Sequence, residues 1–303
     1  MVTGLRWLVA GLISLLLLAF STANLLAQTA STATPATETG KFRLHKFEQP
    51  IGEETYTITR DGSGLTLQSD FDFTDRSTKV PLAATLKAAD DYTPRSFLIR
   101  GKTSRMSAID TSVEINGSKA TIRRGLGAAD SADADSTDKV NSGDGNEGSN
   151  NDARTVAVAP TFFTIAGYAP VVMQMALIRC WRAHGSPAHL ATIPSGEVQI
   201  QDRGSETIDL ATGHTIQTER YTIRGLIWGM ETLWMDNDNN LAALVSTDAE
   251  FDHFEAVREE YEPALAKFVA SAARDEMAAL SELGQGLSGR RTGTFALVGA
   301  TVI

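Results

Sequence analysis

The residues best suited to chemistry lie together near the end of the chain. Four acids and one histidine fall within residues 248–255, namely Asp248, Glu250, Asp252, His253 and Glu255. Carboxylates beside an imidazole could supply acid and base groups to one cleft. The same stretch suits a helix start, because Thr247-x-x-Glu250 has the pattern of a capping box and early acids complement the helix dipole. We favour this structural interpretation and keep the five residues as candidate site residues.

A second group of candidates surrounds the only cysteine, Cys180. His184 follows it by one helical turn and His189 lies nearby, so these three ligands could form a zinc site. A fourth ligand is missing from the sequence, and Gly185 and Pro187 place a turn in between. With apolar neighbours on both sides, Cys180 is expected to be a buried thiol, and a lone cysteine forms no intramolecular disulfide.

Residues 236–240 (DNDNN) begin like a calcium-binding loop. Such a loop needs glycine at its sixth position and glutamate at its twelfth, where this chain has Leu241 and Thr247. A hairpin turn explains the stretch better. The glycines of residues 284–289 match G-x-G-x-x-G, but they follow a helix and precede a strand, the reverse of a dinucleotide-binding site. The sequence therefore offers no complete catalytic site, cofactor motif or metal site.

The composition and the N-terminal residues indicate the class of partner and the cellular location of the protein. The formal net charge is -10 and the 27 cationic residues form no dense run, which argues against a nucleic-acid partner. Arg6 precedes an apolar run over residues 7–20, which as a helix reaches only ~21 Å against a hydrocarbon core of ~30 Å. Residues 1–27 are predicted to be a cleaved signal peptide, so we expect a secreted or periplasmic protein without a stable membrane span. An uncleaved anchor that extends through Leu25 and Leu26 is the alternative.

Two segments are predicted to be disordered. Residues 28–41 are small, threonine-rich and carry Pro35, as expected of a spacer behind the signal peptide. Residues 125–154 hold seven acids, no aromatic residue and many Gly, Ser and Asn, so they cannot bury enough apolar surface to order. A calcium-binding repeat is the alternative for this insertion, but its acids have no regular period.

The folded part is predicted to be α+β and mainly antiparallel. Residues 42–124 have the pattern of successive strands, with hairpin turns at residues 61–64 (DGSG) and 116–117 (NG). Residues 160–183 are predicted to be a helical segment in two pieces, because Gly167 and Pro170 interrupt it. Its apolar side chains cover nearly every face, so this segment must be enclosed. A second group of strands follows over residues 197–246. We therefore expect a curved sheet or half-barrel wrapped around a buried helix.

The predicted order of units follows from these patterns. An antiparallel module covers residues 42–248, and C-terminal helices occupy residues 249–284. A glycine-rich linker then leads to residues 295–303 (FALVGATVI), which have the pattern of a strand with no partner after it. A strand needs partners for its backbone groups. We therefore expect residues 285–303 to be a linker and the first strand of a domain missing from this chain.

Four stretches carry a resemblance to a known family. They are residues 49–56 (QPIGEETY), residues 162–181 with GYAPV at 167–171, residues 248–255 (DAEFDHFE) and residues 297–303 (LVGATVI). Together they resemble the N-terminal accessory region of secreted bacterial amidohydrolases. The resemblance covers most of the chain from residue 42 onward.

The resemblance implies a catalytic partner. In that family the ending is the first strand of a small β-sandwich that precedes a (β/α)8 barrel. The barrel binds divalent metal such as zinc through a His-x-His pair, further histidines and an Asp, and it hydrolyses C–N bonds. No His-x-His occurs in this chain, so no metal ligand carries over. The implied partner is such a barrel, in cis or as a separate chain, and hydrolase activity would belong to residues beyond Ile303.

These observations give two hypotheses for function. The first is a secreted, non-catalytic module that packs on or presents that barrel, in a chain that is truncated or split. The alternative is a stand-alone periplasmic binding module whose curved sheet holds an apolar ligand. Its motivation is a set of side chains expected in the interior, namely Phe162, Phe163, Met173, Met175, Trp181, Trp228 and Trp234. An enzyme complete in this chain would depend on residues 248–255 or Cys180, and we expect no hydrolysis by the isolated chain.

Overall fold

A computed structural model describes residues 36–125, 153–210 and 213–286. These belong to one compact unit, residues 37–303, apart from Ala36, which is the last residue of a separate unit. The predicted signal peptide at residues 1–27, most of the predicted insertion and the predicted strand at residues 295–303 lie outside the described residues.

The described residues form a mainly antiparallel sheet of 15 strands, which confirms the predicted fold class. The order across the sheet is β8-β7-β6-β5-β4-β3-β2-β1-β15-β14-β13-β12-β11-β10-β9. The first strand of the chain, β1, therefore pairs with the last strand, β15. The edge strands β8 and β9 follow each other in the chain. The strands are β1 (Ala36–Lys46), β2 (Gln49–Arg60), β3 (Leu65–Asp75), β4 (Thr78–Ala88), β5 (Pro94–Lys102), β6 (Ala108–Asn116), β7 (Lys119–Arg124), β8 (Ala153–Ala157), β9 (Phe162–Thr164), β10 (Leu190–Ile193), β11 (Glu197–Asp209), β12 (Thr215–Arg224), β13 (Met230–Asp236), β14 (Leu241–Thr247) and β15 (His253–Arg258).

Alternation of side chains explains the first half of this sheet. In β3 and β4 every second residue is buried, and the two strands pair without a break from Leu65 opposite Ala88 to Asp75 opposite Thr78. One face of this part of the sheet is therefore buried and the other faces solvent, as the sequence pattern predicts. The predicted turn at residues 61–64 is also present, since the N–H of Asp61 donates to the carbonyl of Gly64 at 3.3 Å.

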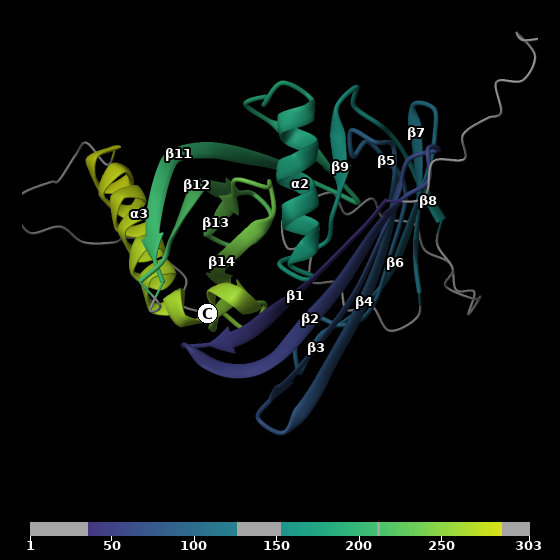
Figure 1. Cartoon of the computed structure of the whole chain (residues 1–303). Helices are drawn as coiled ribbons and strands as arrows, with labels where there is room; N and C mark the ends of the chain where they lie inside the picture. Colours follow the sequence, from purple (N-terminus) through teal and green to yellow (C-terminus); the bar gives the residue numbers. More distant parts are fainter. Residues whose placement is uncertain (1–35, 126–152, 211–212, 287–303) are drawn as a thin grey trace, which may run out of the picture. The chain divides into compact units, whose positions relative to one another are not determined.

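The helix α2 (Val172–Ala183) is enclosed, as predicted. Ten of its twelve residues are buried, and Figure 1 shows the helix inside the curve of the sheet. The fully buried Glu54 of β2 accepts hydrogen bonds from the backbone N–H groups of Val171 and Val172, at 2.7 and 3.0 Å. A helix leaves its first N–H groups without an internal partner. Glu54 therefore fixes the start of α2 from the sheet.

The predicted core helix at residues 160–183 is too long. Its first part contains the short strand β9, which pairs in parallel with β10. Gly167 has a φ of 78° and Pro170 follows, so a continuous helix cannot cross this stretch. The helix begins only after these two residues.

The prediction of helices over residues 249–284 is wrong for its first part. Residues 253–258 form β15, which lies in the sheet between β1 and β14. Phe254 and Ala256 join the core shared with α2, whereas Val257 joins an apolar cluster on the other face. Strands covered on both faces lose the simple alternation that identifies them. The boundary predicted at residue 248 therefore runs through the sheet, and the 3-10 helix η1 (Glu259–Ala264) and the helix α3 (Leu265–Gly286) follow it.

Three predicted loop boundaries also move. Residues 36–41, assigned to the spacer at 28–41, belong to β1, where Glu38 pairs with the buried Arg179 of α2 at 3.0 Å. Residues 153 and 154, assigned to the insertion at 125–154, begin β8 and pair with β7. Gln285 and Gly286, assigned to the linker at 285–303, end α3.

The helix α3 packs on the face of the sheet opposite to α2. Phe268 and Ala272 join Trp234 of β13 and Val257 of β15 in the second apolar cluster, with the rings of Trp234 and Phe268 5.0 Å apart. Figure 1 shows α3 beside β11 and β12. Among the described residues, no helix combines the length and the apolar character that a membrane crossing requires.

Candidate functional site

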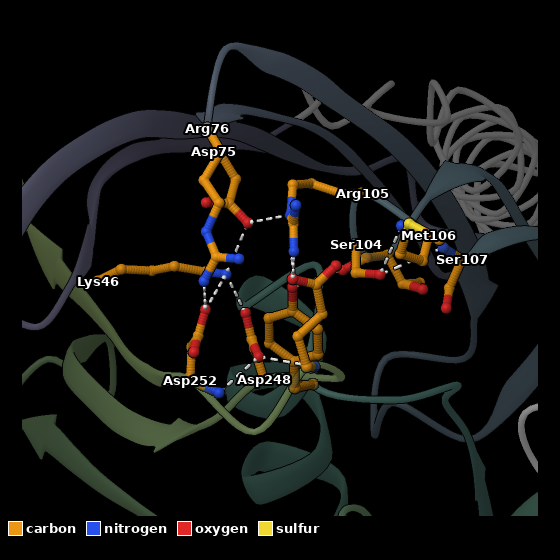
Figure 2. A network of polar contacts seen from close by, with 12 residues as sticks. Lys46, Asp75, Arg76, Ser104, Arg105, Met106, Ser107, Asp248 and Asp252 are labelled. Carbon is orange, nitrogen blue, oxygen red and sulfur yellow. Dashed lines mark hydrogen bonds and ion pairs between the residues drawn. The ribbon is translucent and has the colours of Figure 1, made fainter.

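Hairpin turns from distant parts of the chain meet at one end of the sheet. Because neighbouring strands run antiparallel, the turns after β1, β3, β5 and β14 lie at the same end. Figure 2 shows the polar side chains that these turns bring together. We call the charged ones the turn cluster, which consists of Lys46, Asp75, Arg76, Arg105, Asp248, Glu250 and Asp252.

Lys46 is the central cation of the turn cluster. It ends β1 on the face that also carries the buried Leu44, so its ammonium group lies inside the protein. Its Nζ is 3.2 Å from Asp75 Oδ2 and 3.3 Å from Asp252 Oδ2, and it also pairs with Asp248. Burial alone lowers the pKa of Lys46, but hydrogen bonds and charges from these carboxylates outweigh burial and raise the pKa. Lys46 is therefore a charged residue that links the end of β1 to the end of β3 and to the turn after β14.

Arg105 connects the turn between β5 and β6 to the same carboxylates. Its Nε is 3.1 Å from Asp75 Oδ2, and its Nη2 is 2.8 Å from Glu250 Oε2. The hydrogen bond that Arg105 donates to Glu250 is the largest cause of the raised pKa of Arg105. Arg76 lies 3.9 Å from Asp252. The four carboxylates of the turn cluster thus share three cations.

Part of the turn cluster has the geometry of a metal site. Carboxylate oxygens of Asp75, Glu250 and Asp252 lie within 4.8 Å of one another, and such oxygens suit a hard divalent cation. Each of these three carboxylates already contacts a cation of the chain. Asp75 Oδ2 contacts both Lys46 and Arg105, Asp252 Oδ2 contacts Lys46, and Glu250 Oε2 contacts Arg105. A metal ion would meet two positive charges here, so we interpret the arrangement as an ion-pair network.

The five candidate residues at 248–255 do not start a helix, contrary to the capping-box interpretation. Asp248 Oδ1 accepts the N–H groups of Glu250 and Asp252 at 2.8 and 3.0 Å, which closes a tight turn between β14 and β15. The turn directs Glu250 and Asp252 toward the turn cluster. His253 and Glu255 lie on β15 on the same face as Val257, which is the face that α3 covers. The structure therefore divides the candidates between two places.

His253 and Glu255 form a separate pair. The Nδ1 of His253 bonds to the buried carboxylate of Glu255, which also accepts the backbone N–H of Glu48 at 3.2 Å. The hydrogen bond to Glu255 is the largest cause that raises the pKa of His253. A carboxylate behind an imidazole can orient a general base. However, the imidazole stacks on Phe47 with ring centroids 6.3 Å apart, and no hydroxyl or thiol of the described residues hydrogen-bonds to it.

The zinc candidates are not brought together. Cys180 Sγ is 3.7 Å from His184 Nδ1, but that nitrogen is only 2.8 Å from the carbonyl oxygen of Cys180. His189 pairs with Glu197 at 3.0 Å on an exposed part of the surface. Burial raises the pKa of Cys180 to about 12, so the thiol stays protonated at neutral pH. A protonated thiol is neither a nucleophile nor a good zinc ligand.

Residues 236–240 form a hairpin turn between β13 and β14, as predicted. Asp236 Oδ1 accepts the N–H groups of Asp238 and Asn240 at 3.0 and 2.8 Å. The guanidinium of Arg179 donates to the side-chain oxygen of Asn240 and to the carbonyl of Asn239, both at 2.9 Å. The oxygens of Asn239 and Asn240, which a calcium ion would need as ligands, thus accept hydrogen bonds from Arg179.

Three aromatic side chains are exposed on turns at the same end as the turn cluster. Phe47 is 61% exposed, Trp228 78% and Phe251 69%. Trp228, which was expected in the interior, lies between β12 and β13 and contacts Phe251 edge-on, with ring centroids 5.8 Å apart. The other six side chains that were expected around an apolar ligand are buried in the two apolar clusters.

Sequence reasoning missed four members of the turn cluster, Lys46, Asp75, Arg76 and Arg105. Lys46 had a signal, because it follows Phe42 and Leu44 at the period of two that places a residue on the apolar face of a strand. Asp75 and Arg105 are ordinary turn residues by sequence. Only the pairing of β1 with β15 brings their turns beside residues 248–252.

Comparisons with known proteins do not place the chain in a family. No protein-family model matches it, and no curated protein does. Among solved structures, it is similar to a β-barrel-like protein of a domain of unknown function, DUF1849, from Brucella abortus, with 9% sequence identity and a TM-score of 0.43. The similarity covers 74% of this chain and 95% of the other chain. A similarity this weak carries no argument about function.

Proposed function

We propose that this chain is a non-catalytic module of an exported bacterial hydrolase, which packs on and presents an amidohydrolase barrel. The observation that carries this proposal is the role of the candidate acids. Those of the turn between β14 and β15 are bound by Lys46 and Arg105, and they fix turns that expose Phe47 and Phe251. A reaction centre needs groups free to meet a substrate. A docking module needs a rigid surface with exposed aromatic side chains.

The identity of the partner is proposed from the sequence resemblance to the N-terminal region of secreted amidohydrolases. In this proposal the barrel, in cis or as a separate chain, supplies the divalent metal such as zinc and attacks the C–N bond. The alternative, a periplasmic binding module for an apolar ligand, has less support. The helix α2 and six of the seven side chains expected around the ligand are themselves packed in the protein interior.

The test compares the isolated chain with the product of its full reading frame. Both are assayed for Zn²⁺-dependent hydrolysis of a panel of amides and esters. We expect turnover by the longer product alone, and we expect His253→Ala to leave that turnover unchanged. Two results would contradict the proposal. One is the lack of a His-x-His barrel in the same or a neighbouring frame, and the other is metal-dependent turnover by the isolated chain that His253→Ala abolishes.

A further inference from the structure

Four large apolar side chains are exposed on turns at the end of the sheet where the turn cluster lies. Met106 is 82% exposed in the turn after β5, next to Arg105 (Figure 2). The three exposed aromatic side chains described above lie in the turns after β1, β12 and β14. Because neighbouring strands run antiparallel, all four turns lie at the same end of the sheet. We call these side chains the tip surface, which consists of Phe47, Met106, Trp228 and Phe251.

Direct contacts join the aromatic members of the tip surface. The backbone N–H of Phe47 donates to the carbonyl of His253 at 3.1 Å, and the ring of Phe47 stacks on the imidazole of His253. Phe251 lies two residues before His253 in the same turn. The ring of Phe251 contacts that of Trp228, with centroids 5.8 Å apart. The turns after β1, β12 and β14 therefore carry one continuous group of aromatic side chains.

The turn cluster connects Met106 to this group. Met106 follows Arg105, whose Nη2 lies 2.8 Å from Glu250, and Glu250 directly precedes Phe251. The side-chain oxygen of Ser104 accepts the backbone N–H of Met106 at 3.1 Å, which closes the turn that carries Met106. Ion pairs below the tip surface thus hold its turns together.

The charges of these turns cancel. We count the turns that carry the turn cluster and the tip surface, each from the last residue of one strand to the first residue of the next, with histidine neutral. They hold five cations and five acids, whereas the whole chain has a net charge of -10. The cations are Lys46, Arg76, Lys102, Arg105 and Arg224, and the acids are Glu48, Asp75, Asp248, Glu250 and Asp252. A surface without net charge suits a neutral partner better than a charged protein or an anionic membrane.

The apolar area is small for a protein partner. At the observed exposures the three aromatic side chains present roughly 400 Å², about half of the ~800 Å² that each partner contributes to a standard protein interface. The rings of Trp228 and Phe251 are inclined by 80° to each other, so they form no flat platform for a sugar ring. The interfacial layer of a bilayer accepts separate aromatic side chains without a complementary pocket, and such side chains favour this layer.

We propose that the tip surface docks on a zwitterionic lipid surface, with its four side chains in the headgroup layer. The carboxylates of the turn cluster are already paired with Lys46 and Arg105, so docking leaves few free charges to desolvate. This inference rests on the proposed function for a rigid docking surface, and it names lipid as what that surface contacts. In this arrangement the barrel packs on another face of the module.

The experiment uses vesicles of phosphatidylcholine and the chain of residues 28–303. Residues 1–27 are left out because their apolar run would itself bind lipid. Trp228 is a natural probe, since the other two tryptophans of this chain, Trp181 and Trp234, are only 7% and 0% exposed. We expect vesicles to shift the tryptophan emission to the blue, and we expect phosphatidylcholine with brominated acyl chains to quench it.

The test variant is Phe47→Asn/Phe251→Asn. The two residues have φ values of 50° and 65°, and asparagine tolerates this left-handed region, so the turns can keep their shape. We expect the vesicle partition coefficient to fall at least about tenfold, because two buried aromatic side chains are lost. Leu280→Gln is the matched control, since Leu280 is as exposed as Phe47, at 61%, but lies on α3. We expect this control and the addition of phosphatidylglycerol to leave partition unchanged.

Three results would overturn the inference. The first is an emission of Trp228 that phosphatidylcholine vesicles leave unchanged. The second is binding that requires phosphatidylglycerol and is lost at high salt, and the third is binding that Leu280→Gln removes but Phe47→Asn/Phe251→Asn does not.

The outcomes also separate this inference from the proposed function. If the chain binds vesicles as expected but no barrel is encoded in the same or a neighbouring frame, the proposed function fails and the inference stands. If vesicles have no effect while Phe47→Asn/Phe251→Asn weakens binding to the barrel, the occupant is a protein, so the inference fails and the proposed function stands. A dimer of the chain that this variant dissociates would make a second copy the occupant and would likewise overturn the inference.

Discussion

Replacing Glu231 by glutamine tests how the buried carboxyl groups around α2 respond to pH. Glu231 of β13 is fully buried, and its Oε1 accepts a hydrogen bond from Gln174 Nε2 at 3.3 Å. Its Oε2 and the amide oxygen of Gln174 both lack a donor in the described structure. A proton on Glu231 supplies that donor. Burial raises the pKa of Glu231 to about 8 from 4.5, which agrees with a neutral acid at this position.

The sign of the pH effect follows from this raised pKa. The stabilisation is complete below the pKa of the unfolded chain, near 4.5, and is lost as pH rises toward the folded value of about 8. At 1.36 kcal/mol per pKa unit, the loss is roughly 4 to 5 kcal/mol across this interval. In Glu231→Gln the new amide pairs with Gln174 at every pH. We therefore expect the variant to gain about 4 kcal/mol over the wild type between pH 5 and pH 8.

The assay is urea unfolding followed by tryptophan fluorescence at several pH values from 5 to 9. Glu54→Gln serves as the contrasting variant, since Glu54 accepts two backbone N–H groups of α2 and the hydroxyl of Ser69. Burial raises the pKa of Glu54 to about 7, but an amide cannot accept all these bonds. This variant should lose about 1 to 3 kcal/mol even at pH 5. Equal pH slopes for the wild type and Glu231→Gln would refute the reasoning.

Three further predictions concern groups with defined partners. Lys46→Met leaves buried carboxylates without their cation and should cost about 3 to 5 kcal/mol in urea unfolding; a loss below 1 kcal/mol would contradict the role of the turn cluster. The pKa of His253, measured by NMR, should lie above 6.5 and fall in Glu255→Gln. The pair then stabilises the fold below pH 6.5, and this contribution is lost as pH rises through the folded pKa. A pKa that Glu255→Gln leaves unchanged would show that Glu255 does not raise the pKa of His253. Cys180 should react with a disulfide reagent on the order of 100-fold more slowly in the folded protein than in urea, whereas equal rates would place the thiol outside the core.

Much of the fold could be predicted because local patterns identify hairpins. The alternation in β3 and β4, the turns at residues 61–64 and 236–240, and the apolar faces of α2 all carry this information in a few adjacent residues. The strand β15 could not be predicted in the same way. Its two faces are both covered, and its partner β1 lies about 200 residues earlier in the chain, so a capping-box pattern outweighed the strand signal.

The candidate site shows the same limit. The acids at residues 248–252 were visible in the sequence, but their partners Lys46 and Arg105 come from the turns after β1 and β5, which only the sheet topology brings close. Trp228 was expected in the core because residues 226–235 were taken as one apolar strand. The glycines at 225 and 229 instead belong to a turn between β12 and β13, which exposes Trp228. The sequence shows which residues are charged or apolar. It does not show which side chains from distant turns form ion pairs with them or bury them.

The most direct measurement for the central claim is the free energy of unfolding of Glu250→Gln. Glu250 contacts Arg105 at 2.8 Å within the turn cluster, which contains four carboxylates. If these acids form ion pairs that hold the turns of the docking surface in place, the free energy of unfolding of the variant falls by about 1 to 3 kcal/mol. If they form a reaction centre, in which like charges are held together at a cost in stability, removing one charge makes the protein more stable. A loss is the result that our account predicts, and a gain would contradict it.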